Sequence, residues 1–149
     1  MQQLAFYKWF FYIFDMSKKL KLRDTGCPVA FGLDIFGDRW SLLVIRDIML
    51  NDKNTYQQFL EAGEGISTNI LADRLKHLEA EGILEKSQDP DNRRSYIYQL
   101  TKKGRDLAPV LLEIITWSGE HDQRPSALTG VLEKIRKDRK GLEAKIRAG

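Results

Sequence analysis

Apolar and polar residues recur along the first half of the chain at the spacing of α-helices. A short apolar segment, residues 28–36, opens at Pro28, a residue suited to the first helical position, and is broken by Gly37-Asp38. A second helix is predicted over residues 40–50, ending at Asn51. Its apolar residues share one face: Trp40, Leu43, Val44, Ile48 and Met49.

Residues 55–82 predict two short helices joined by a glycine-containing turn. Thr55 is suited to cap the first helix, which turns Phe59 inward. Ser67 is suited to cap the second helix, which Gly82 terminates. The second helix is predicted to bury a stripe made of Ile70, Leu71, Leu75 and Leu78. Two short helices with such a turn are typical of a helix-turn-helix.

A β-hairpin is predicted directly after these helices. Residues 83–86 and 95–100 have the pattern of strands, and residues 89–92, Asp-Pro-Asp-Asn, form a dense turn signal between them. A hairpin in this position is a wing. The predicted fold class is therefore mainly α with a small β-hairpin, a winged helix-turn-helix with flanking N- and C-terminal dimerisation helices.

A long helix is predicted from Thr101 onward, with a kink at Pro109 because proline removes a backbone donor. Its apolar residues cover more than one face, which exceeds what one small core can bury and predicts a dimer interface. The residues assigned to that interface are Leu107, Leu111, Ile114 and Trp117.

The pattern predicts three segments: a winged helix-turn-helix domain over residues 16–122, a basic amphipathic tail helix over residues 123–149, and an apolar, aromatic stretch over residues 1–15. Arg139 interrupts the apolar stripe of the tail helix. Residues 1–15 are either an upstream extension, with translation starting at Met16, or an interfacial anchor. They are too short to span a bilayer, so we expect no stable membrane association and a cytoplasmic protein.

Charge is distributed unevenly over the 149 residues, whose formal net charge is +3. Both ends of the chain are basic, whereas residues 24–123 carry more Asp and Glu than Lys and Arg. Overall basicity therefore does not indicate DNA binding by the central domain, and local placement of Lys and Arg must supply it.

The helix that begins at Ser67 carries the candidate base-reading residues. Thr68 and Asn69 lie in its first turn, where an Asn can make a bidentate contact to adenine and a Thr can touch a thymine methyl. Arg74 and Lys76 are placed for phosphates. Asp73 is acidic, so it must either lie away from phosphate or accept a hydrogen bond from a cytosine.

Arg93 and Arg94 lie at the predicted hairpin tip, where they serve no core, and an arginine there can enter the electronegative minor groove. Lys102, Lys103 and Arg105 are further candidates for phosphate contacts.

Cys27 is the single cysteine and precedes Pro28 at a predicted helix start, an environment that favours a reactive thiolate. It is a candidate redox-sensing residue; the alternative is a small, partly buried apolar residue. With two histidines and one cysteine, the chain offers no metal site, and no catalytic triad or phosphate loop is present, so neither a cofactor nor an enzyme is expected.

Three stretches, CPVAFGLDIFGDRWSLLVIRDI, GISTNILADRLKHLEAEGILEK and YQLTKKG, together with Trp117, resemble the HxlR-type family of bacterial regulators. The resemblance runs from about Cys27 to Gly119. It implies a dimeric winged helix that binds palindromic operators in double-stranded DNA, in some members under control of a cysteine at the Cys27 position. The wing hairpin, with Arg93 and Arg94, is more similar to that of the MarR family.

The sequence thus predicts a homodimeric, sequence-specific DNA-binding transcriptional regulator, with Cys27 as a candidate sensor of oxidants or electrophiles. Two alternatives remain open. One is a winged-helix protein-interaction module without DNA binding, which the acidic central domain favours. The other is a ligand-gated, MarR-like regulator with an unknown small-molecule inducer.

Overall fold

The computed structural model describes residues 25–124, 127 and 130–149, so the predicted segment 1–15 lies outside the described residues. The chain divides into two compact units, Met1–Gly37 and Asp38–Gly149. In the first unit, helix α2 (Pro28–Phe36) begins with Pro28 in its first turn, as predicted. Among the described helices, none is both long enough and apolar enough to cross a membrane.

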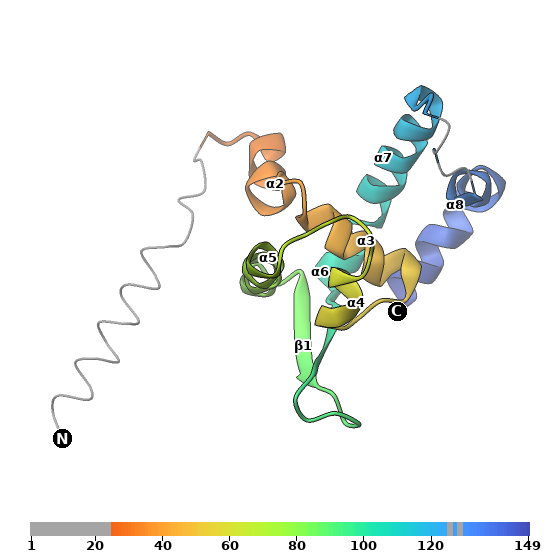
Figure 1. The fold of residues 1–149 in the computed structure, drawn as a ribbon. Helices are drawn as coiled ribbons and strands as arrows, with labels where there is room; N and C mark the ends of the chain where they lie inside the picture. Colours follow the sequence, from red (N-terminus) through yellow and green to blue (C-terminus); the bar gives the residue numbers. More distant parts are fainter. Residues whose placement is uncertain (1–24, 125–126, 128–129) are drawn as a thin grey trace, which may run out of the picture. The chain divides into compact units, whose positions relative to one another are not determined.

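The second unit holds the helix-turn-helix, the hairpin and the C-terminal helices (Figure 1). Their order is α3 (Ser41–Asn51), α4 (Tyr56–Leu60), α5 (Thr68–Ala80), β1 (Leu84–Gln88), β2 (Tyr96–Leu100), α6 (Lys102–Arg105), α7 (Ala108–His121) and α8 (Gly130–Ala148). The two strands pair antiparallel, with Leu84 opposite Leu100 and Gln88 opposite Tyr96. The prediction of a mainly helical winged helix-turn-helix is confirmed.

Local chemistry sets the boundaries of α4 and α5. Thr55 accepts a hydrogen bond from the Gln58 amide and Gln58 returns one to the Thr55 backbone, which makes a capping box. Ser67 accepts from the Ile70 amide at 3.4 Å. Gly82 follows α5 with a φ of +69°, a left-handed conformation that glycine adopts without steric cost.

The core of this unit lies between α3, α5, the base of the hairpin and α7. Its buried apolar residues include Val44, Ile45, Phe59, Leu71, Leu75, Leu78, Ile83, Leu84, Leu100 and Leu112. Ile70 was predicted to belong to the buried stripe but is 40% exposed. It precedes Leu71 by one residue, a rotation of about 100° around the helix, which turns it off the buried face. Ile45 was not predicted and is fully buried, whereas Leu43, Ile48 and Met49 are half-buried.

The predicted long helix after Thr101 is wrong in one respect, because two helices occupy that stretch. Thr101 caps α6 by accepting from the Gly104 amide at 3.1 Å, and α6 already ends at Arg105. Pro109 then lies in the first turn of α7 rather than at a kink inside a helix. The first turn is where a missing backbone donor costs nothing.

The last helix, α8, packs on the winged-helix unit. Gly119 of α7 permits the close approach, because a Cβ at this position would lie 2.5 Å from Leu132 Cδ2. The helix is kinked at Asp138, whose φ and ψ are −156° and 75°. Arg139 bonds Glu113 of α7 at 2.6 Å. Helix α8 belongs to the same compact unit as α3–α7.

Candidate nucleic-acid interface

The N-terminal turn of α5 presents polar side chains to solvent. Ser67, Thr68 and Asn69 are all exposed, as are Asp73 and Lys76 further along. Because Leu71, Leu75 and Leu78 anchor the opposite face in the core, the helix cannot rotate these polar residues inward without exposing three leucines. The residues predicted to read bases thus share an outward-facing surface at the capped end of the second helix of the helix-turn-helix.

Tyr56 fixes the position of that turn, and sequence reasoning missed it. Its hydroxyl donates a hydrogen bond to the Thr68 carbonyl oxygen at 2.9 Å, tying the first turn of α4 to the first turn of α5. No local pattern reveals this contact, because it depends on how the Gly63–Gly65 turn brings the two helices together.

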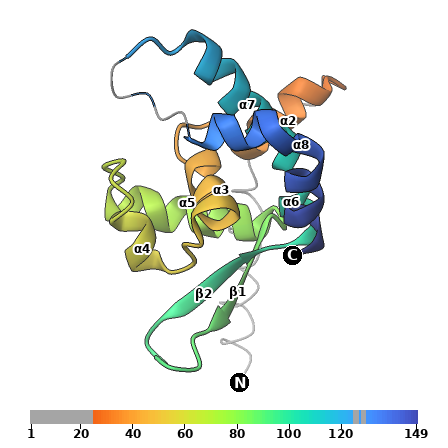
Figure 2. The same ribbon diagram turned by 90° about the vertical axis from the view of Figure 1, so that its right-hand side faces the viewer.

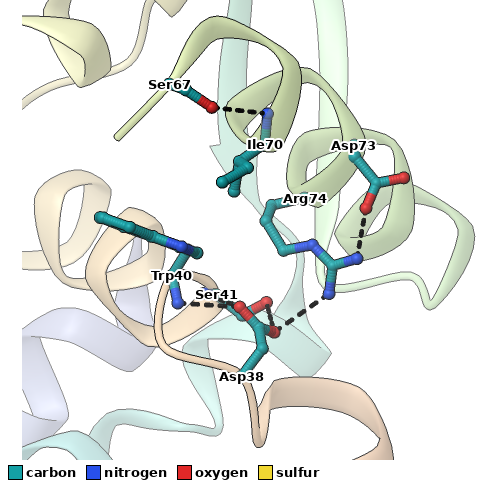
Figure 3. Close-up of polar contacts among 7 residues, drawn as sticks. All are labelled: Asp38, Trp40, Ser41, Ser67, Ile70, Asp73 and Arg74. Atoms are coloured by element: carbon teal, nitrogen blue, oxygen red, sulfur yellow. Dashed lines mark hydrogen bonds and ion pairs between the residues drawn. The ribbon is translucent and has the colours of Figure 1, made fainter. Parts of the chain in front are cut away.

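Asp38 organises the other side of α5 (Figure 3). Its carboxylate accepts from the Trp40 amide at 2.8 Å and from the Ser41 amide at 3.0 Å, and it also bonds the Ser41 hydroxyl. Arg74 Nη1 reaches the same carboxylate at 3.2 Å. Asp38 therefore caps the start of α3 and joins it to the middle of α5, a role that the sequence indicates only as an Asp just before a helix.

Asp38 and Arg74 each stabilise the charged form of the other. Partial burial raises the pKa of Asp38, but hydrogen bonds from Ser41 and Trp40 and the charge of Arg74 outweigh burial, so the pKa lies below its usual value of 3.8. Arg74 also bonds Asp73, and this hydrogen bond raises the pKa of the guanidinium. Arg74, predicted as a phosphate contact, is half-buried and forms ion pairs with Asp38 and Asp73. Asp73 is thus paired with a residue of its own helix.

Replacing Asp38 with alanine tests this capping role. Asp38→Ala removes the cap of α3 and leaves Arg74 with one partner fewer, and we expect a loss of about 1–3 kcal/mol in the free energy of unfolding at pH 7. Since the folded-state pKa is lowered, the carboxylate stabilises the fold above pH 4 and ceases to do so as the pH falls below 4. Urea unfolding should therefore show the difference between wild type and variant shrinking from pH 5 to pH 2; a constant difference would contradict the role assigned to the charge.

The hairpin projects away from the helices, with its turn at the far end (Figure 2). Asn92 structures this turn: its carbonyl oxygen accepts from the Ser95 amide at 2.8 Å and its side chain accepts from the Arg94 amide at 3.2 Å. Gln88 donates to the Arg93 carbonyl oxygen at 2.7 Å. The side chains of Arg93 and Arg94 are exposed, and neither has an acidic partner within residues 25–124, 127 and 130–149.

A single-residue bridge ties the wing to the residue that precedes α4. Thr55 forms an isolated antiparallel bridge with Ile97, and the Tyr98 amide donates to the Asn54 carbonyl oxygen at 2.8 Å. Phe59 meets Tyr98 edge to face, with ring centroids 6.1 Å apart. The wing is therefore held by the residues that cap α4.

The three cations after the wing, predicted as candidates for phosphate contacts, each have a partner within the chain. Lys102 pairs with Asp106 at 3.0 Å, and Lys103 donates to the Glu81 carbonyl oxygen at 2.6 Å. Arg105 donates to the Leu100 carbonyl oxygen at 2.9 Å and is half-buried. Each thus has a partner within the chain that the sequence pattern did not indicate.

The predicted dimer-interface residues differ in exposure. Leu111 is only 5% exposed and Leu107 is half-buried, so their own chain already covers them. Ile114 and Trp117 are 43% and 63% exposed. In the first unit, Val29, Phe31 and Leu33 of α2 are exposed as well.

Cys27 occupies the N-cap position of α2 with an exposed, free thiol. Its side chain makes no capping hydrogen bond, which leaves the sulfur available to solvent. Within the described ranges, no group of three or more His, Cys, Asp or Glu side chains is placed to hold a metal ion.

Comparison with known proteins identifies the family. The family described as HxlR-like helix-turn-helix matches residues 35–126, more than half of the chain. The chain belongs to the HxlR-like helix-turn-helix family. The matched residues contain the whole helix-turn-helix and wing, whereas α8 lies beyond them.

Relatives of known sequence or structure agree with this assignment. An HTH-type transcriptional regulator of Synechocystis, sll1512, is 34% identical over 72% of this chain and 83% of its own length. The crystal structure of PA1607 superposes with a TM-score of 0.63 at 34% identity, covering 69% of this chain and 70% of the other. The redox regulator HypR in its oxidised form has a TM-score of 0.58 at 28% identity, covering 66% of this chain and 100% of the other.

Proposed function

We propose that two copies of this transcriptional regulator bind a palindromic operator in double-stranded DNA, each placing the first turn of α5 in a major groove. The observation that carries the proposal is the exposed, capped turn Ser67–Asn69 beside a wing whose two arginines lack acidic partners among the described residues. Its relatives in the HxlR-like family, named as HTH-type transcriptional regulators, support the same function.

Each exposed residue has a separate task in this proposal. Thr68 and Asn69 read base edges, whereas Lys76 meets phosphate and fixes the register. Arg93 and Arg94 enter the minor groove from the wing. Arg74, held by Asp38 and Asp73, acts through the position of α5 rather than by contacting DNA.

The dimer is proposed to form through exposed apolar side chains of α7 and of α2. Ile114 and Trp117 of α7, together with Phe31 of α2, are large apolar groups that a second copy would remove from water. A symmetric dimer presents two α5 helices, so the operator should be palindromic. Such a regulator acts in the cytoplasm, where it meets the bacterial chromosome.

Selection of bound genomic fragments by the purified full chain, followed by sequencing, tests this function. We expect enriched fragments to share a palindromic sequence with half-sites about one helical turn apart. Enrichment without any shared sequence would contradict base-specific reading, and a single half-site without symmetry would contradict the dimer.

Replacing Asn69 with alanine should relax base preference. We expect Asn69→Ala to lower the ratio of operator to scrambled-duplex affinity by about tenfold or more, because one bidentate contact to a base is lost in each half-site. Anisotropy titration with both duplexes measures the ratio. Gln57→Ala, an exposed change on α4, serves as the control; an equal loss in both variants would contradict the role of Asn69.

Cys27 is proposed as a redox-sensing residue, supported by its exposed thiol and by the likeness to the redox regulator HypR. In this step the Cys27 thiols of two chains form a disulfide, and diamide accepts the two electrons and two protons. We expect diamide to yield a covalent dimer on a non-reducing gel and to change operator affinity at least threefold, with dithiothreitol reversing both. Cys27→Ser should show neither change, and an unaltered response in that variant would exclude Cys27 as the sensor.

A protein-interaction module that does not bind DNA is the second candidate, favoured by the surplus of Asp and Glu in residues 24–123. It predicts weak duplex binding with little dependence on salt. The DNA-binding proposal predicts a steep loss of affinity with rising salt, since phosphate contacts release counterions.

A further inference from the structure

A cleft of about 720 Å³ lies between part of α8 and the elements on which α8 packs. The C-terminal part of α3, strand β2, and helices α6, α7 and α8 line it. This volume falls within the range of about 300–1,000 Å³ that small-molecule sites occupy. Its α8 wall lies beyond residues 35–126, so the family domain alone does not enclose it.

The cleft joins an apolar surface to a cluster of cations. Ile48 of α3, Leu112 of α7, and Leu142 and Ile146 of α8 supply apolar side chains to its lining. The lining also includes Lys53, Arg105, Lys134 and Lys145, against two acidic residues, Asp52 and Glu85. Gly149 lines the cleft as well and lies beside the Arg105 guanidinium. An apolar surface with a surplus of positive charge is complementary to an amphipathic anion.

Arg105 provides the most specific feature of the cleft. Its Nη1 is bound to the Leu100 carbonyl oxygen at 2.9 Å, which fixes the side chain. Its Nε is buried and finds no hydrogen-bond acceptor among the residues that the structure describes. A buried donor without a partner is costly, and an anionic oxygen that reaches the guanidinium group from the cleft would form a charge-assisted bond with it.

The cleft adjoins the base of the wing. Tyr98, Gln99 and Leu100 of β2 line it together with Asn54, whose carbonyl oxygen accepts from the Tyr98 amide. Arg105 itself is bound to the last residue of β2. An occupant would therefore contact the strand that carries the wing.

We propose that this cleft binds a small organic anion with an apolar body, anchored by Arg105, and that its occupancy shifts the wing. The binding step is independent of the function proposed above, whereas the effect on the wing rests on it. Duplex DNA is a poor occupant, because the apolar floor offers nothing to a phosphate backbone.

Fluorescence titration with a matched pair of probes tests the binding step. 1-Anilinonaphthalene-8-sulfonate carries one anionic group on an apolar ring system, and N-phenyl-1-naphthylamine has the same rings without charge. We expect the full chain to bind the sulfonate at one site, about tenfold or more tighter than the neutral compound. Equal affinities for the two probes would overturn the assignment of an anion site.

Variants locate the site. Arg105→Gln should lower sulfonate affinity about tenfold and leave the neutral probe unchanged. Lys102→Gln removes the same charge from the same helix outside the cleft and should change neither. Trp117→Ser, on the exposed face of α7, should also leave binding unchanged; loss of binding there would place the probe on the surface and overturn the proposal.

A second pair of substitutions tests the site even if the Arg105 variant misfolds. Lys134 and Lys145 are exposed at the rim of the cleft, so Lys134→Gln with Lys145→Gln should keep the native circular dichroism spectrum and still weaken sulfonate binding at least threefold. Unchanged binding in this double variant would contradict the role of the cations.

The effect on the wing is measured separately, on operator binding in saturating sulfonate. We expect operator affinity to change at least threefold in the wild type and not in Arg105→Gln. An unchanged affinity would overturn the regulatory step, while the titration alone decides the binding site. Failure of DNA binding altogether would overturn the proposed function and leave the titration result standing.

Discussion

Replacing both wing-tip arginines, Arg93→Ala with Arg94→Ala, is expected to weaken operator binding by about 100-fold or more without unfolding the protein. Both side chains are exposed and unpaired within the described part of the chain, so nothing in the fold requires them. A dimer places four such arginines on DNA, and at about 1 kcal/mol for each contact the total loss approaches 4 kcal/mol. Anisotropy titration at fixed salt measures the change.

A matched control distinguishes the loss of wing contacts from the loss of net positive charge. Arg136→Ala with Lys137→Ala removes the same formal charge from exposed positions of α8. We expect this pair to change operator affinity less than threefold. Should both double variants weaken binding equally, long-range electrostatics would account for the effect and the wing contact would be refuted.

Gly104→Ala is expected to be the most destabilising single change proposed, at about 2–4 kcal/mol. Gly104 is buried, and a Cβ there would lie 2.3 Å from the Ile83 carbonyl oxygen and 3.0 Å from Leu100 Cδ2. The Ile83 carbonyl oxygen is part of the backbone and also accepts from the Thr101 amide at 3.0 Å. Relief of the clash would therefore require α6 and the base of the hairpin to separate.

Gly130→Ala provides the matched comparison for Gly104. No heavy atom of the described residues lies within 4 Å of a Cβ at Gly130, which starts α8. There the substitution should be neutral or stabilise the protein by up to about 1 kcal/mol, because alanine loses less backbone freedom on folding. Urea unfolding of both variants measures the difference; a tolerated Gly104→Ala would show that the hairpin base is looser than the structure indicates.

The elements that the sequence predicted well are those whose ends depend on local chemistry. Thr55, Ser67 and Thr101 cap helices as expected, because a side-chain oxygen reaches an amide three residues away. Gly82 ends α5 for a similarly local reason. The wing hairpin was predicted from β-forming residues on either side of a turn signal.

The features that escaped prediction depend on contacts between distant residues. Asp38 and Arg74 are 36 positions apart, and only the packing of α3 against α5 brings them together. Leu111 was assigned to a dimer interface because apolar periodicity cannot distinguish a face covered by the same chain from one covered by a second copy. The cleft beside α8 likewise exists only after α8 has folded back toward α3 and β2.

One titration decides whether α5 and the wing read the bases of duplex DNA. The full chain is titrated into a labelled duplex recovered by genomic selection and into a scrambled duplex of equal length and composition, at several salt concentrations. We expect the affinity to be at least about 10³-fold higher for the selected duplex, and the affinity for both duplexes to fall steeply as salt rises. Equal affinities for the two duplexes at every salt concentration would contradict it.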